Sequence, residues 1–205
     1  IILCFLSIGL AFAQSQYVFR HLDIVDGLSD NQIRSLSMTP DKRLGVRTAS
    51  ILNIYNGATF EHFYQDRNQE YSWDYIRSPK EYYDKQGRIW MKERDYLLLL
   101  DLNKNRFNYS IQEELDSYGI KQELTNLFVD TYQNFWFITK DNTLSMYDVD
   151  KQKLTTVTRG DSDFTEQYGV PVELTQYKNL CWIVYSSGLI RCWDYASHEF
   201  VLQDT

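Results

Sequence analysis

The chain has 205 residues and a formal net charge of −7, so it is long enough for one sizeable domain and has no basic surface to neutralise nucleic-acid phosphates. Aromatic residues make up 16% of the sequence, against only 9 glycines and 3 prolines, which favours β-strands and argues against disorder. No run of basic residues exceeds two, which excludes a basic membrane-surface patch.

The N-terminal stretch differs from the rest. Residues 1–13, IILCFLSIGLAFA, carry no charge and end with Ala11 and Ala13 at the two positions that a signal peptidase reads. We interpret residues 1–13 as a secretory signal peptide that lacks its beginning, with Gln14 as the first mature residue. The stretch is too short to span a bilayer, and Leu3 ahead of Cys4 fits a lipoprotein signal poorly. The sequence therefore predicts export.

The remainder of the chain repeats itself. Trp90, Trp136 and Trp182 are each 46 residues apart, and Gly45 stands at the corresponding place 45 residues before Trp90. An apolar strand ending in a polar turn precedes each of these anchors, and aspartates mark the first three turns: Asp41, Asp84 and Asp130. Tyr177-Lys178-Asn179 replaces the aspartate turn in the fourth unit.

Each unit contains four short strands. Apolar and polar residues alternate within them, as in residues 52–55, which suits half-buried strands. Four strands at a period of about 45 residues predict β-propeller blades, so we expect an all-β fold of four-stranded antiparallel blades. The tryptophans should pack between neighbouring blades. Residues 110–124 have helical character but fall between units, where a loop or short helix can lie.

Two features indicate the kind of propeller. The Gly-His signature of WD40 blades and the paired glycines of kelch blades are missing, whereas Asp84-Gly87-Trp90 and Trp182 with Gly188-Leu189 resemble the two-component-regulator propeller repeat. Residues 19–36, FRHLDIVDGLSDNQIRSL, resemble the opening of the periplasmic sensor region of Bacteroides-type hybrid two-component histidine kinases. The motif residues that match are Asp26-Gly27-Leu28-Ser29 and Asn31.

This resemblance implies a function for the whole parent protein. Residues 14–205 would be about four of seven blades of a periplasmic sensor that binds oligosaccharide breakdown products and controls polysaccharide-utilisation genes. The parent would be a dimeric histidine kinase anchored in the inner membrane, and the remaining blades would be partners of this segment. The segment itself would bind no nucleic acid and no cofactor. The alternative is a secreted propeller lectin or a glycan-active enzyme.

No catalytic or metal site is predicted. The aspartates recur at repeat turns, where local hydrogen bonding explains them. His21, His62 and His198 are scattered and have no serine or cysteine partner in a triad-like context. We therefore expect no enzymatic activity in this segment.

Ligand contacts are expected where the second-to-third-strand turns and the connections between blades share one face of the propeller. Alternating aromatics in residues 65–78 could stack on sugar rings, and basic residues could bind hydroxyl or acidic groups. Alternatively, these aromatics begin the innermost strand of the second blade and belong to the core. The candidate ligand-binding residues are Tyr71, Trp73, Tyr75, Arg47, Arg94 and Lys140.

The last expectation concerns Cys181 and Cys192, which flank a hairpin in what would be an oxidising compartment. A two-residue turn, Ser186-Ser187, would place the cysteines directly opposite each other, within disulfide range. A three-residue loop, Ser186 to Gly188, would instead oppose Cys181 to Trp193 and leave both thiols free. Both registers are compatible with the sequence, and neither cysteine has the neighbours of a zinc site.

Overall fold

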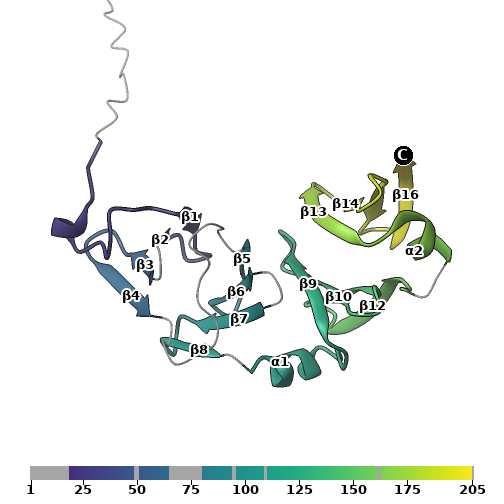
Figure 1. The fold of residues 1–205 in the computed structure, drawn as a ribbon, viewed down its shortest axis with the longest axis horizontal. Coiled ribbons are helices and arrows are strands. Elements are labelled where there is room, and N and C mark those ends of the chain that lie inside the picture. The colour runs from purple at the N-terminus through teal and green to yellow at the C-terminus, as the bar shows by residue number, and fades with distance from the viewer. Residues whose placement is uncertain are drawn as a thin grey trace, which may run out of the picture.

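A computed structural model describes residues 19–48, 51–64, 80–93, 96–108, 110–160 and 163–204. These residues form four separate sheets, each with four antiparallel strands in sequence order. The prediction of an all-β protein made of four-stranded propeller blades is confirmed. Figure 1 shows the sheets arranged side by side along an arc, with the first strand of each on the concave side.

The four sheets are called blades 1 to 4. Blade 1 consists of β1 (Ser35–Met38), β2 (Leu44–Arg47), β3 (Ile51–Tyr55) and β4 (Phe60–Tyr64). Blade 2 consists of β5 (Lys80–Tyr83), β6 (Arg88–Glu93), β7 (Tyr96–Asp101) and β8 (Arg106–Asn108). Blade 3 consists of β9 (Leu124–Val129), β10 (Phe135–Thr139), β11 (Leu144–Asp148) and β12 (Lys153–Thr158). Blade 4 consists of β13 (Pro171–Tyr177), β14 (Leu180–Tyr185), β15 (Ile190–Asp194) and β16 (Glu199–Asp204).

Short helices lie between the sheets. α1 (Gln112–Ser117) follows blade 2, in the segment whose sequence has helical character. α2 (Asp163–Tyr168) follows blade 3, and a 3-10 turn, η1 (Ile24–Asp26), precedes blade 1. No helix among the described residues is long and apolar enough to cross a lipid bilayer. The predicted signal peptide, residues 1–13, lies outside the described residues.

The tryptophan repeat is explained by packing between blades. Trp90 of blade 2 and Trp136 of blade 3 are both 0% exposed. Trp90 contacts Phe135 of the next blade, and Trp136 contacts Trp193 of blade 4. The core is therefore a series of apolar layers between successive sheets, as expected from the sequence. Burying aromatic side chains of this size supplies much of the stabilisation between sheets.

The aspartate repeat has a matching explanation. The indole Nε1 of Trp90 donates to Asp84 Oδ2 at 2.9 Å, and the indole of Trp136 donates to Asp130 Oδ2 at 3.0 Å. Each carboxylate also accepts a backbone N–H of its own turn, so one aspartate satisfies both a turn and a buried indole. In blade 1 the place of Asp84 is taken by Thr39, whose hydroxyl accepts Arg43 N at 2.9 Å, rather than by Asp41.

The sheets curve around a common axis. Lys80 on β5 forms an ion pair with Glu173 on β13, although these strands belong to blades 2 and 4 and are not neighbours. The Lys80 ammonium also lies 5.4 Å from the ring centroid of Phe128, on β9 of the intervening blade. Such a contact requires the first strands of three successive blades to face one centre, which is the geometry of a propeller.

The motif that carries the family resemblance has a structural role. Ser29 N donates to Asn53 Oδ1 at 3.1 Å, and His62 Nε2 lies 2.8 Å from the carbonyl oxygen of Gly27. Leu28 is buried, and Asn53 on β3 is fully buried. The segment of residues 26–29 is therefore fixed to blade 1, where buried polar groups are paired and an apolar side chain is removed from water.

The hairpin register corrects the disulfide expectation. Cys181 pairs with Trp193, and Trp182 pairs with Cys192, so the two cysteines lie on opposite faces of blade 4 and are free. The physical reason is the three-residue loop, Ser186 to Gly188, which is closed by Tyr185 N donating to Leu189 O at 2.8 Å. Gly188 has a φ of 96°, the left-handed conformation that such loops require and that glycine adopts without strain.

Candidate functional site

The propeller segment has two ends with different loops. The connector face carries the β6–β7, β10–β11 and β14–β15 turns together with the connections between blades. The turn face carries the remaining turns, β5–β6, β9–β10, β11–β12 and β15–β16 among them. Because neighbouring strands are antiparallel, these two sets of loops lie at opposite ends of each sheet.

One of the predicted ligand contacts, Lys140, lies in the β10–β11 turn on the connector face. The β10–β11 turn contacts both flanking connections: Lys140 N donates to Glu123 O at 2.9 Å, and Gly160 passes directly against Asp141. The Lys140 ammonium is exposed and lies 2.8 Å from Glu123 Oε2, which raises the pKa of Lys140. Turns and connections thus share one face, and Lys140 is available to solvent there.

Arg47 has a different environment. It ends β2 and is 2% exposed, with its Nη1 3.9 Å from Glu81 Oε1 of blade 2. Burial raises the pKa of Glu81, an effect that the nearby Arg47 charge opposes. The structure therefore places Arg47 between blades 1 and 2, where it is buried beside Glu81.

The other sequence-predicted residues cannot be placed. Tyr71, Trp73, Tyr75 and Arg94 lie outside the described residues. Within the described part of the chain, no three histidine, cysteine, aspartate or glutamate side chains lie together as metal ligands.

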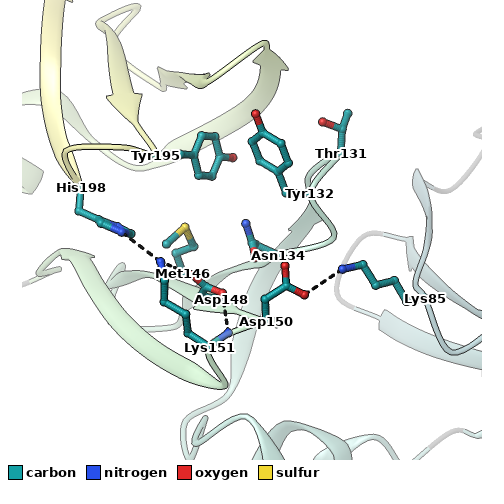
Figure 2. Close-up of a pocket in the computed structure, with 10 residues that line it drawn as sticks. All are labelled: Lys85, Thr131, Tyr132, Asn134, Met146, Asp148, Asp150, Lys151, Tyr195 and His198. Atoms are coloured by element: carbon teal, nitrogen blue, oxygen red, sulfur yellow. Dashed lines mark hydrogen bonds and ion pairs between the residues drawn. The ribbon is translucent and has the colours of Figure 1, made fainter.

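The turn face contains a groove that the sequence did not indicate. It has a volume of about 400 Å³ and lies among the turns of blades 2, 3 and 4 (Figure 2). Ten residues line it: Lys85, Thr131, Tyr132, Asn134, Met146, Asp148, Asp150, Lys151, Tyr195 and His198. The groove continues along β11 and β12 into a further 210 Å³ that shares Met146, Asp148, Lys151 and His198.

Two tyrosines form one wall of this groove. The rings of Tyr132 and Tyr195 meet edge to face, with centroids 5.1 Å apart. Tyr195 Oη donates to Asp130 Oδ2 at 2.6 Å, which connects blade 4 to the carboxylate that accepts the Trp136 indole. Burial and the nearby Cys181 and Asp130 strongly raise the pKa of Tyr195, so its hydroxyl remains a donor.

Ion pairs form the other wall. Lys151 Nζ lies 2.9 Å from Asp148 Oδ2, and Lys85 Nζ of blade 2 lies 3.1 Å from Asp150 Oδ1 of blade 3. Burial opposes ionisation of Asp148, but hydrogen bonds from the Lys151 backbone and ammonium outweigh it and lower the pKa of Asp148. His198 Nε2 lies 3.5 Å from Lys151 Nζ at the edge of the groove. These pairs are visible as dashed lines in Figure 2.

The corresponding crevice between blades 1 and 2 provides a comparison. It has a volume of about 220 Å³ and is lined by Pro40, Asp41, Arg43, Lys85, Gln86, Gly87, Leu102 and Asn103. It has no aromatic wall. The groove between blades 3 and 4 is thus about twice as large and chemically distinct, although the repeat places both at the same kind of junction.

The four blades define a β-propeller segment, and a solvent-accessible groove lies among their turns. Solved structures with the same fold include the extracellular domains of the hybrid two-component systems BT3049 and BT4673 from B. thetaiotaomicron. The BT3049 domain is 17% identical with a TM-score of 0.53, covering 88% of this chain and 26% of that one. The BT4673 domain is 17% identical with a TM-score of 0.54, covering 87% and 25%.

PorZ of Porphyromonas gingivalis, described as an essential bacterial surface component of the type-IX secretion system, is similar in fold. It is 14% identical with a TM-score of 0.56, covering 87% of this chain and 23% of that one. This chain therefore spans about a quarter of the length of these structures. No protein-family model matches the sequence, and no curated protein matches it.

Proposed function

We propose that this chain is the exported, ligand-sensing propeller segment of a hybrid two-component sensor. The observation that carries the proposal is the succession of four blades, which shares its fold with the extracellular domains of two hybrid two-component systems. The lead motif Asp26-Gly27-Leu28-Ser29, fixed on blade 1, supports the same assignment.

The proposal extends to ligand and location. The segment would lie in the periplasm, recognise oligosaccharide breakdown products and thereby control polysaccharide-utilisation genes. It would act with the remaining blades of a dimeric, membrane-anchored parent. The segment would recognise its ligand without transforming it. A propeller can present turns from several blades to one ligand. The groove in Figure 2 is lined by turns from three blades, which supports the proposal.

Deleting the gene tests this proposal. In the source bacterium, the deletion strain should lose transcriptional induction by one polysaccharide while its responses to other polysaccharides remain. The coding sequence after Thr205 should specify further blades, a membrane-spanning helix and a histidine kinase. Unchanged induction by every polysaccharide, or a coding sequence without a kinase, would contradict the proposed function.

A second candidate is a surface carbohydrate-binding propeller without a kinase. The observation that favours it is the likeness in fold to PorZ, which is described as a surface component. The same deletion strain separates the two candidates: loss of glycan binding by whole cells, with normal induction, would favour the surface protein.

A further inference from the structure

The two tyrosines in the groove depart from the repeat. Tyr132 stands two residues after Asp130, where Gln86 stands after Asp84 in blade 2. Tyr195 directly follows Asp194, in a place that blades 2 and 3 fill with the aliphatic residues Leu102 and Val149. Residues that depart from the local sequence pattern of a fold tend to lie at functional sites. Both aromatic departures fall on the same wall of the same groove.

Both phenol hydroxyls already have partners within the protein. Tyr195 donates to Asp130, and Tyr132 Oη donates to the carbonyl oxygen of Lys178 at 3.1 Å. Tyr132 is nonetheless 45% exposed. Figure 2 shows the two rings side by side along one wall, across from Asp148 and Lys151. The wall therefore offers fixed apolar ring surface to solvent, which suits the apolar face of a ring-shaped ligand.

The opposite wall offers both hydrogen-bond donors and acceptors. Two lysines and two aspartates form two ion pairs, so their formal charges cancel. Adjacent hydroxyl groups of a sugar can donate to a carboxylate and accept from an ammonium group at the same time. Each lysine is already paired with an aspartate. An acidic ligand would therefore have to displace Asp148 or Asp150 from its lysine and replace one charge-assisted hydrogen bond with another.

The dimensions agree with a small ligand. A volume of about 400 Å³, with its 210 Å³ extension, falls within the range of about 300 to 1,000 Å³ that small-molecule sites occupy. We propose that the groove on the turn face binds one or two rings of an uncharged sugar, stacked on Tyr132 and Tyr195. This inference rests on the proposed sensing function, and it moves the ligand site from the connector face to the opposite end of the propeller.

Calorimetry on the complete exported protein tests the inference. The probes are neutral glucan, mannan, galactan and fructan oligosaccharides, and acidic polygalacturonate and chondroitin sulfate fragments. A neutral sugar should bind, and Tyr132→Ala and Lys151→Ala should each weaken its binding about tenfold, as expected for a lost ring contact or charge-assisted hydrogen bond. Both side chains are exposed enough to be removed without unfolding the protein.

Matched controls come from the repeat. Lys104 pairs with Asp101 in the blade 2 turn as Lys151 pairs with Asp148 in blade 3, so Lys104→Ala removes the same contact outside the groove. Tyr177→Ala removes another exposed tyrosine. Both controls should leave the affinity unchanged.

Three results would overturn the inference. If a neutral sugar binds but only Trp73→Ala or Lys140→Ala weakens it, the groove is not the site, although the sensing function stands. If only acidic sugars bind through Tyr132 and Lys151, the class of ligand is wrong. If neither panel binds and the deletion strain keeps its induction, the proposed function fails and the inference fails with it.

Discussion

Asp130 shows how much of this structure depends on single polar residues. Its carboxylate accepts the Trp136 indole and the Tyr195 hydroxyl, which come from blades 3 and 4, as well as Asn134 N in its own turn. The aspartate is 5% exposed, so these donors have little access to water as an alternative partner. Leaving buried donors unsatisfied is costly.

Asp130→Ala should therefore lower the free energy of unfolding by roughly 2 to 4 kcal/mol. Urea unfolding of the exported protein measures this change. The control is Asp150→Ala, which removes a carboxylate that is 81% exposed and should cost under about 1 kcal/mol. Equal effects of the two substitutions would contradict the role assigned to Asp130.

The thiols provide a second prediction at this scale. Burial raises the pKa of Cys181 to about 12, and it also raises the pKa of Cys192. At pH 8 only about one Cys181 in ten thousand would be a thiolate. In the exported protein, from which Cys4 is removed with the predicted signal peptide, Cys181 and Cys192 should resist a thiol reagent until urea is added, and these two should then react. Fewer than two in unfolded, unreduced protein would mean that a disulfide exists.

Asp141 gives a prediction about pH. The Thr139 hydroxyl donates to Asp141 Oδ1 at 2.6 Å and, with backbone and side-chain hydrogen bonds from Thr143, holds the pKa of Asp141 below its usual range. Because the folded pKa is lower than the unfolded one, the stabilisation is present above about pH 4 and is lost as the pH falls through the folded pKa.

Thr139→Val should therefore lower the melting temperature near neutral pH, and the difference from wild type should shrink below about pH 4. Thermal melts between pH 3 and 6 measure this. Thr125→Val is the control, since the Thr125 hydroxyl donates to a backbone carbonyl and its loss should not depend on pH in this range. If the difference in melting temperature between Thr139→Val and wild type stayed constant from pH 3 to 6, stability would not depend on the ionisation of Asp141 in the way described.

At the scale of elements, close approach between loops matters as much as strand pairing. A Cβ on Gly160 would lie 1.6 Å from the carbonyl oxygen of Asp141, so the connection after β12 fits against the β10–β11 turn only without a side chain. A Cβ on Gly57 would meet nothing within 4 Å, although this glycine has a φ of 97°.

Gly57→Ala should thus cost about 1 to 2 kcal/mol through backbone strain alone. Gly160→Ala should cost more, because backbone must move to remove the overlap. Denaturant unfolding of both variants compares the two costs. A smaller loss for Gly160→Ala would mean that the connection does not approach the turn so closely.

Much of the element structure could be predicted from the sequence. The tryptophan spacing predicted the blades, because Trp90 and Trp136 each fill the layer between their own sheet and the next. Helix α2 was missed, since six residues are too few to show an amphipathic period. The hairpin register stayed open because Ser-Ser is compatible with either loop length, and a one-residue shift moves Cys192 to the other face.

The groove could not be predicted because its parts are distant in the sequence. Tyr132 and Tyr195 are 63 residues apart and each looks like an ordinary turn residue within its own unit. Only the packing of blade 4 on blade 3 brings them together. The sequence did contain one indication of the groove: both tyrosines differ from the residues at the corresponding turn positions of the other units.

At the scale of the whole molecule, one face of the blade 4 sheet has no further blade packed against it among the described residues. Blade 4 exposes Ile190 and Leu202 beside the half-buried Trp182, whereas the corresponding face of blade 3, with Trp136 and Met146, is covered. Residues 14–205 produced alone should therefore self-associate through this face.

Replacing both Ile190 and Leu202 by lysine should make that chain more monodisperse without lowering its melting temperature, as light scattering and thermal melts would show. Gln203→Lys with Glu199→Lys is the control, because these exposed residues are already polar. A chain of residues 14–205 that is monodisperse without any substitution would contradict the idea that this face needs a cover.

Every functional proposal depends on the curvature that brings blades 2, 3 and 4 around one axis, and the Lys80–Glu173 contact reports it most directly. A short bismaleimide should cross-link Lys80→Cys with Glu173→Cys within one molecule of the exported protein, in which Cys181 and Cys192 are buried. It should not cross-link Lys80→Cys with Gln203→Cys on the outer strand β16. Efficient cross-linking of the first pair alone is the result expected for a propeller. Failure of the first pair, or equal yields for both, would contradict it.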